Sequence, residues 1–241
     1  MSEPTQRDHP VRFEWGPTGG AAVAAGAGAV VVVDVLSFTT TVTVAVERGV
    51  QVIPYPLHEP AAETVAASHG AALAVPRGGS GLSLSPASVL DAGELPARLV
   101  LPSPNGSTVA ARLAAETTRV VAGSLRNAST VAAFLDDVEE IAVVAAGERW
   151  PDGSLRPAIE DLWGAGAILA ALEDAGADLS PEATVAADAY RLVEGRLAGH
   201  LAASTSGIEL ISAGHSRDVD LAAELDASSV VPVLGVDGFT A

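Results

Sequence analysis

Short runs of apolar residues, many of them β-branched, recur along the chain and alternate with turns and alanine-rich stretches. The run 29–33 has no polar break, which is typical of a strand buried on both faces of a sheet. Similar runs predict strands at 11–15, 29–33, 50–55, 73–75, 98–101, 118–122, 141–146 and 230–233. After a first helix that ends before Gly49, helices are predicted at 60–69, 109–115, 131–135, 158–174, 181–201, 205–213 and 218–225.

Strand, turn and helix alternate at least five times before residue 158, and the chain is mostly helical after it. This order predicts an α/β fold, with a mostly parallel sheet, helices on both faces and a helical C-terminal third. The stretches 16–28, 77–88 and 147–157 lack a clear period and are predicted to be connecting loops. Because no shift in composition marks a linker, residues 1–241 are interpreted as a single domain.

The most informative polar residues follow the strand at 29–33. Asp34 stands where this strand leaves the sheet, and hydroxyl side chains follow at Ser37, Thr39, Thr40 and Thr41. In open α/β sheets, ligands bind beyond the carboxyl ends of the strands, next to the first turn of the following helix. A carboxylate facing hydroxyls and free amides there suits a metal ion together with an anion. The alternative is that Asp34 caps the helix and the threonines form its solvated first turn.

Two later turns have a similar form, because each follows a predicted strand and opens a predicted helix. The turn Asn105-Gly106-Ser107 offers a hydroxyl and amides that suit a phosphate or sulfonate oxygen. The turn 123–127 adds Arg126, whose guanidinium is able to make a bidentate contact with an oxyanion. The alternatives are a plain turn with a helix cap in the first case and a solvated arginine in the second.

A pair of acids, Glu160 and Asp161, lies in the first turn of the helix predicted at 158–174. Acids in this place complement the helix dipole, and this is the structural alternative to a functional role. Gly164 and Gly166 follow in the next turn, where they allow a ligand or another backbone to come close. At the same sheet edge as Asp34, the two acids would complete a site for a hard cation such as Mg²⁺, which needs few protein carboxylates.

Composition narrows the classes of partner and the place in the cell. The formal net charge is −17, and all 13 basic residues are arginine, so nucleic acids and anionic membranes are not expected partners. Cysteine is absent, which excludes disulfides, thiolate metal sites and a cysteine nucleophile. The first residues contain no apolar signal region, and the longest apolar run is far too short to span a bilayer. A cytoplasmic protein is therefore expected.

Five segments, in chain order, together resemble one known family. They are VVVDVLSFTTTVTVAVERG, RGGSGLSLSP, PNGS, GSLRNAS and AGERWPDGSLRPAIEDLWGAGAI. Over about residues 30–233, the chain is similar to the 2-phosphosulfolactate phosphatase family, and the first and last segments are the most specific. The resemblance implies an α/β fold and a cytosolic, Mg²⁺-dependent homodimeric phosphatase. Such an enzyme converts 2-phospho-3-sulfolactate to 3-sulfolactate and phosphate, a step on one route to coenzyme M.

The chain departs from the family pattern at three places. Many members have an arginine where this chain has Ser37, and many have an arginine where it has Thr108. The loop 81–86 lacks the aspartate and the asparagine that the family usually has there. These departures remove polar and cationic groups from the expected rim of the substrate site. They favour an ester less anionic than phosphosulfolactate, unless Arg77 and Arg126 compensate.

Phosphate ester hydrolysis needs a metal to neutralise phosphoryl charge, a positioned nucleophile and donors for the phosphoryl oxygens. We assign Asp34 and Asp161 as expected Mg²⁺ ligands, and Glu160 as a further ligand or as the base for water. The small anionic ester would then contact Thr39, Thr40, Arg77, Asn105, Gly106, Ser107 and Arg126. An aspartyl-phosphate route through Asp34 stays open, although position 36 is a leucine and the usual second aspartate is missing.

Two other classes of function, a binding protein and an oxidoreductase, are alternatives to a phosphatase. A phosphate- or sulfonate-binding protein of the same fold without turnover would account for the missing arginines, whereas the retained acids oppose it. A nucleotide-binding oxidoreductase on a doubly wound sheet has less support. No Gly-x-Gly-x-x-Gly motif follows a strand with an acid about twenty residues later.

Overall fold

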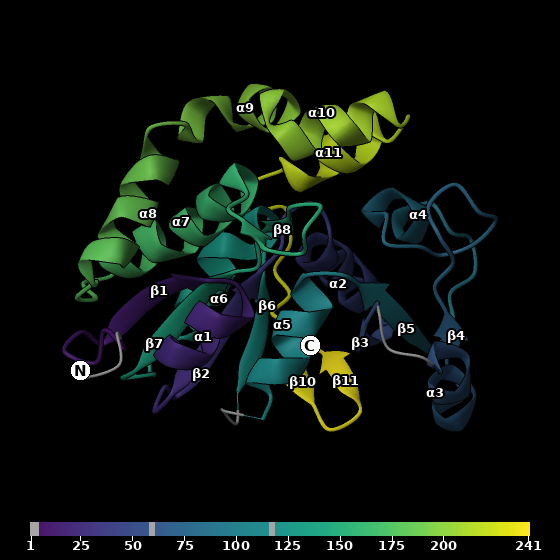
Figure 1. The fold of residues 1–241 in the computed structure, drawn as a ribbon, viewed down its shortest axis with the longest axis horizontal. Helices are drawn as coiled ribbons and strands as arrows, with labels where there is room; N and C mark the ends of the chain where they lie inside the picture. The colour runs from purple at the N-terminus through teal and green to yellow at the C-terminus, as the bar shows by residue number, and fades with distance from the viewer. Residues whose placement is uncertain (1–4, 58–60, 116–118) are drawn as a thin grey trace.

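The computed structural model describes residues 5–57, 61–115 and 119–241, and a nine-stranded sheet organises them (Figure 1). Four strands at one side of the sheet run parallel, three at the other side also run parallel, and an antiparallel hairpin joins the two blocks. In sheet order the strands are β1 (Val11–Trp15), β7 (Ile141–Ala145), β2 (Ala29–Val33), β6 (Val120–Gly123), β10 (Val233–Gly235), β11 (Gly238–Thr240), β3 (Gln51–Pro56), β5 (Arg98–Ser103) and β4 (Ala72–Leu73).

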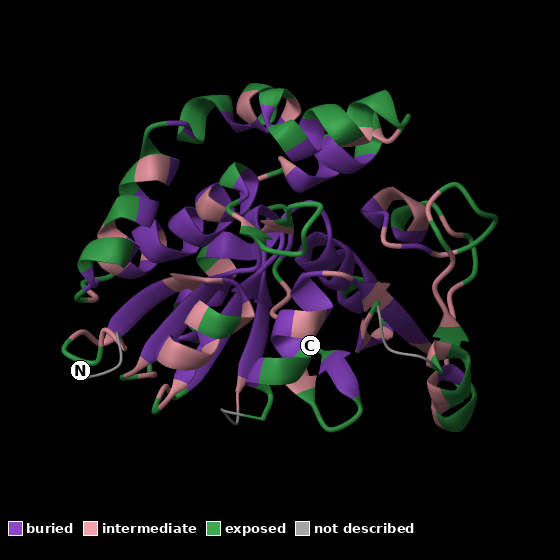
Figure 2. Cartoon of the chain, in the orientation of Figure 1, coloured by how far each residue is buried: buried purple, intermediate pink, exposed green. Residues whose placement is uncertain are grey.

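The valine run of β2 accounts for the two layers of helices. Val31 and Val33 point into one apolar core, and Val30 and Val32 point into the other, so every residue of β2 is buried. The first core is covered by α6 (Ala128–Phe134), α7 (Ile159–Asp174) and α8 (Pro181–Arg191), and the second by α1 (Gly16–Ala24), α2 (Phe38–Glu47) and α5 (Gly106–Leu113). Figure 2 shows the buried strands between outer helices with exposed faces. The predicted α/β fold with a mostly parallel sheet is confirmed.

The remaining helices include one, Ala62–His69, that packs against β4 and β5. They are α3 (Ala62–His69), α4 (Pro86–Leu90), the 3₁₀ turns η1 (Leu125–Asn127) and η2 (Glu194–Arg196), α9 (Leu197–Ala203), α10 (Thr205–Ser212) and α11 (Ser216–Ala222). The C-terminal helices form an arch at the top of Figure 1, and α11 packs against α4. None of the helices that the structure describes is both long and apolar enough to cross a membrane.

All three predicted loops contain regular structure, since the last residues of 77–88 begin α4. The stretch 16–28 holds α1, whose glycines weaken the helical pattern but whose Val23 and Ala24 are buried against the sheet. The stretch 147–157 holds a small hairpin of β8 (Glu148–Arg149) and β9 (Leu155–Arg156). Strands of two residues are too short to show an alternating pattern.

Two further predicted elements differ from the observed ones, one by an internal break and one by a shift along the chain. The helix predicted at 181–201 is divided into α8, η2 and α9, with Gly195 inside the break. The strand predicted at 230–233 begins only at Val233 and continues as the antiparallel hairpin β10–β11. Parts of the predicted elements 60–69 and 118–122 lie outside the described residues.

The contact between α7 and α8 depends on a glycine. A Cβ atom added at Gly166 would lie 2.1 Å from the carbonyl oxygen of Ala186 and 2.8 Å from Cβ of Tyr190. No side chain larger than hydrogen fits there without a shift of α8. α7 carries two of the predicted site acids, Glu160 and Asp161, in its first turn. Its packing against α8 therefore helps to position these acids.

Replacing Gly166 by alanine is expected to lower the free energy of unfolding by about 1–3 kcal/mol, because the methyl group must push α8 away. Gly199→Ala is the matched control. Gly199 is exposed in α9 with no atom within 4 Å of its added Cβ, so alanine there should stabilise by up to about 1 kcal/mol. Urea unfolding measures both changes. Equal stability of Gly166→Ala and the wild type would contradict this account of the packing.

Candidate active site

Asp34 joins three segments at the carboxyl end of β2. Its side chain is buried, Oδ1 accepts a hydrogen bond from the amide of Phe38 at 3.1 Å, and Oδ2 accepts one from the amide of Gly106 at 2.8 Å. The first bond is the contact that the helix-cap alternative expects. The second is not, because it reaches across to the turn after β5. A Cβ at Gly106 would lie 2.6 Å from Oδ2, so glycine is what allows this amide to approach the carboxylate.

Asp161 is held in the same way at the start of α7. Its Oδ1 accepts from the amide of Val35 at 2.7 Å and its Oδ2 from the amide of Gly147 at 2.9 Å, so the carboxylate ties together the segments that follow β2 and β7. Its neighbour Glu160 is only 2% exposed. No residue within 5–57, 61–115 or 119–241 donates a hydrogen bond to the Glu160 carboxylate. A buried carboxylate of this kind is available for an external partner.

A fourth acid, Glu148, belongs to the cluster although the sequence reasoning did not assign it a role. It lies on β8 and accepts a hydrogen bond from the side-chain amide of Asn105 at 2.8 Å. Its carboxylate is close enough to interact electrostatically with Asp34 and Glu160. The signal was present in the sequence, because Glu148 follows a strand within the Ala146-Gly147-Glu148 segment that carries the family resemblance.

Crowding and burial change the acidity of these groups. Burial raises the pKa of Asp34 to about 6, against the opposing effect of the two amide bonds. Burial and the negative charge of Asp34 raise the pKa of Glu148 to about 7. Burial, followed by the charges of Asp34 and Glu160, raises the pKa of Asp161 well above its usual value. A positive charge placed between these carboxylates would therefore lower their pKa values and stabilise their ionised forms.

Three predicted substrate contacts have hydroxyls that already bond to the backbone. Thr39 Oγ1 donates to the carbonyl of Asp34, Thr40 Oγ1 donates to the carbonyl of Val35, and Ser107 Oγ bonds the carbonyls of Tyr55 and Ser103. These bonds fix the turns after β2 and β5. A direct contact of these hydroxyls with substrate stays a prediction.

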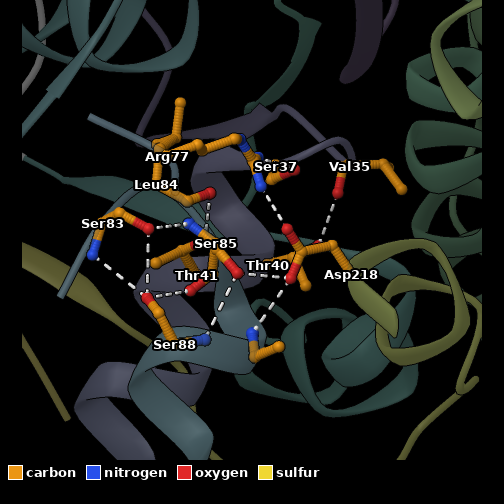
Figure 3. A network of polar contacts seen from close by, with 11 residues as sticks. Val35, Ser37, Thr40, Thr41, Arg77, Ser83, Leu84, Ser85, Ser88 and Asp218 are labelled. Carbon is orange, nitrogen blue, oxygen red and sulfur yellow. Dashed lines mark hydrogen bonds and ion pairs between the residues drawn. The ribbon is translucent and has the colours of Figure 1, made fainter. Parts of the chain in front are cut away.

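The two predicted arginines lie against different segments. Arg77 pairs with Asp218 of α11 and donates to Ser37 Oγ at 2.7 Å, so its guanidinium reaches the start of α2 (Figure 3). Arg126 pairs with Glu224 and also donates to the carbonyl of Leu221 at 3.1 Å. Arg126 thereby holds the end of α11 against η1, and its contact with an anion stays a prediction. Arg77 thus has its guanidinium beside residue 37, and its contact with a substrate anion stays a prediction.

The oxygen atoms of the acid cluster are possible ligands for a divalent cation. Among the residues that the structure describes, no three acidic or histidine side chains are arranged to enclose a metal by themselves. Mg²⁺ does not require such a cage, since it keeps several waters and takes one or two carboxylates together with substrate phosphate. Each bonded oxygen of Asp34 and Asp161 retains a lone pair, and Glu160 lacks a donor from the described chain. This set of hard oxygen donors fits Mg²⁺.

A cavity of about 240 Å³ opens beside the cluster. Asn105 and Glu148 line it on one side, and Trp15, Thr18 and Arg149 line it on others. Of the four acids, Glu148 lines this cavity, which lies between the start of α1 and the β8–β9 hairpin. Its position beyond the ends of β1 and β7 is the one expected for a ligand in an open α/β sheet.

Comparisons with known proteins identify a family to which the chain is similar. The family model described as 2-phosphosulpholactate phosphatase matches residues 21–236. A protein of Deinococcus radiodurans, named "Probable 2-phosphosulfolactate phosphatase", is 33% identical over 212 residues, which cover 83% of this chain and 85% of that protein. The match includes all four acids of the cluster. The chain therefore belongs to the 2-phosphosulfolactate phosphatase family and is a phosphoric monoester hydrolase.

Proposed function

We propose that this protein is a Mg²⁺-dependent phosphatase that hydrolyses 2-phospho-3-sulfolactate to 3-sulfolactate and phosphate. The observation that carries the proposal is the cluster of Asp34, Glu148, Glu160 and Asp161 at the strand ends of a chain of this family. The name of the Deinococcus relative supports the choice of substrate. The guanidinium of Arg77 at Ser37 supports a substrate that carries a second anionic group.

Asp34 and Asp161 would hold the Mg²⁺ ion. Each is fixed by two backbone amides, so neither needs to reorganise when a cation arrives. When bound, Mg²⁺ neutralises charge on the phosphoryl oxygens during hydrolysis. The buried positions of the two carboxylates strengthen this effect, because charges interact more strongly away from water.

Glu160 would act as the base for the attacking water. Its carboxylate is buried, has no donor from the described chain and lies within electrostatic reach of Asp34 and Asp161. It takes one proton as the water oxygen bonds to phosphorus and the bond from phosphorus to the ester oxygen breaks. Glu148, held by Asn105 at the cavity, is the second carboxyl placed for proton transfer, in this case to the departing oxygen.

The substrate proposal is tested by phosphate release. Protein freed of metal with EDTA should release phosphate from 2-phospho-3-sulfolactate only after Mg²⁺ is added, and it should act less efficiently on 2-phospholactate, which lacks the sulfonate. A preference for phospholactate would favour the less anionic ester that the sequence departures suggest. Mg²⁺ binding without release from either ester would favour the binding protein without turnover.

Glu160→Gln separates catalysis from a helix-dipole role. The amide cannot accept the proton of water, so kcat should fall by about 10²–10⁴. Glu182→Gln is the control, because Glu182 is an exposed acid in the first turn of α8 and should leave kcat unchanged. Equal effects of the two substitutions would contradict the base assignment. Asp34→Asn is a poorer probe, since the asparagine amide would face one of the two backbone N–H groups and destabilise the fold.

The raised pKa values predict how stability depends on pH. Asp34 and Glu148 have ordinary pKa values of 3.8 and 4.5 and folded values of about 6 and about 7. Between these limits the folded protein binds more protons than the unfolded chain, so the metal-free protein should lose stability as the pH rises from about 4 to 7. Mg²⁺ requires ionised carboxylates, so it should raise the melting temperature more at pH 8 than at pH 5.

Thermal melts in EDTA and in Mg²⁺ at the two pH values measure this dependence. NaCl at the same ionic strength controls for general screening of the net charge of −17. A larger Mg²⁺ effect at pH 5, or none at either pH, would contradict the metal assignment.

A further inference from the structure

Asp218 is a buried acid outside the catalytic cluster. It lies on α11 and is only 1% exposed. Its Oδ1 accepts hydrogen bonds from Ser85 Oγ at 2.5 Å and from the amide of Ala87 at 3.2 Å, and its Oδ2 pairs with Arg77. Both carboxylate oxygens are thus bonded to the segment 77–90, as Figure 3 shows. A carboxylate this deeply buried is stable only with such partners, so the contact between α11 and this segment is strongly held.

The guanidinium that Asp218 holds extends to the start of α2. Arg77 donates to Ser37 Oγ at 2.7 Å, and Ser37 lies three residues after Asp34. The side chain of Arg77 is 19% exposed, and its charge acts on the carboxylate of Asp34. The cation therefore lies at the rim of the acid cluster, open to solvent on one side.

Arg77 has donors left for a ligand. The bonds to Asp218 and Ser37 use two of the five N–H groups of the guanidinium. A guanidinium with fixed orientation loses little side-chain entropy when it binds, and its planar array of donors matches the oxygens of a sulfonate or carboxylate. The pair with Asp218 fixes that orientation before the ligand arrives.

We propose that Asp218 is a positioning residue that holds Arg77 in place to bind the second anionic group of the substrate, the sulfonate or carboxylate that is not transferred. The inference rests on the proposed function for its substrate. It assigns part of the specificity to α11, more than 180 residues after Asp34 in the chain. Asp218 itself does not touch the substrate and acts through Arg77.

Asp218→Asn is the most selective test. Asparagine keeps Oδ1 for Ser85 and Ala87, so the contact of α11 with α4 is retained, but its amide group replaces the oxygen that pairs with Arg77. Arg77→Ala and the double variant complete the set. Asp91→Asn is the control, because Asp91 and Arg217 form an exposed ion pair at 2.5 Å across the same junction without contacting Arg77.

The expected result is a rise in KM for 2-phospho-3-sulfolactate of about tenfold or more in Asp218→Asn and in Arg77→Ala, with kcat within about twofold of the wild type. The double variant should be no worse than Arg77→Ala alone, because Asp218 acts through Arg77. Asp91→Asn should match the wild type. Unchanged KM, a lower KM in Asp218→Asn, additive effects in the double variant or an equal effect of Asp91→Asn would each overturn the proposal.

Calorimetric titration with 3-sulfolactate separates this inference from the proposed hydrolysis. Wild-type protein that binds 3-sulfolactate, with affinity lost in Asp218→Asn and Arg77→Ala, supports the positioning role even if no ester is hydrolysed. Hydrolysis with unchanged 3-sulfolactate affinity in both variants supports the proposed function and overturns the positioning role. Wild-type protein that neither hydrolyses the ester nor binds 3-sulfolactate overturns both.

Discussion

The hydrogen bonds from backbone amides to Asp34 and Asp161 are the interaction on which the site depends. Four amides, from Phe38, Gly106, Val35 and Gly147, hold the four carboxylate oxygens. The amides belong to the segments after β2, β5 and β7, so the acids fix the relative positions of three strand ends. The same bonds help to offset the cost of burying two carboxylates. Under the proposed function, the same side chains would serve both the structure and the chemistry at this edge.

The acid cluster and the protein as a whole are both negatively charged, so neither attracts an anionic substrate. The net charge of −17 repels anions, and salt screens most of this repulsion at distances beyond about 10 Å. Attraction must therefore be local. Arg77 at the rim of the cluster is already paired with Asp218, whereas Arg149 and Arg156 of the β8–β9 hairpin form no ion pair with another described residue. Recognition here depends on directed hydrogen bonds more than on net positive charge.

The sequence was sufficient to predict the elements whose hydrophobic pattern is long and uniform. The valine run of β2 predicts a strand buried on both faces, and Asp34, Glu160 and Asp161 meet as expected because parallel strands bring their ends to one edge. The partners of Arg77 and Arg126 could not be predicted, since Asp218 on α11 and Glu224 just after it lie about 100 to 140 residues away in the chain. The β8–β9 hairpin and α1 were missed because their residues have weak local preferences.

The hairpin β10–β11 has a consequence for how the protein is made. It lies between β6 and β3 and connects the two parallel blocks, yet it follows every other strand in the described chain. During synthesis, which proceeds from the N-terminus, the facing edges of β6 and β3 stay unpaired until residues 233–240 leave the ribosome. Once β6 is complete at Gly123, the nascent protein therefore has two open sheet edges until the hairpin emerges, and such edges are sites for pairing with other chains.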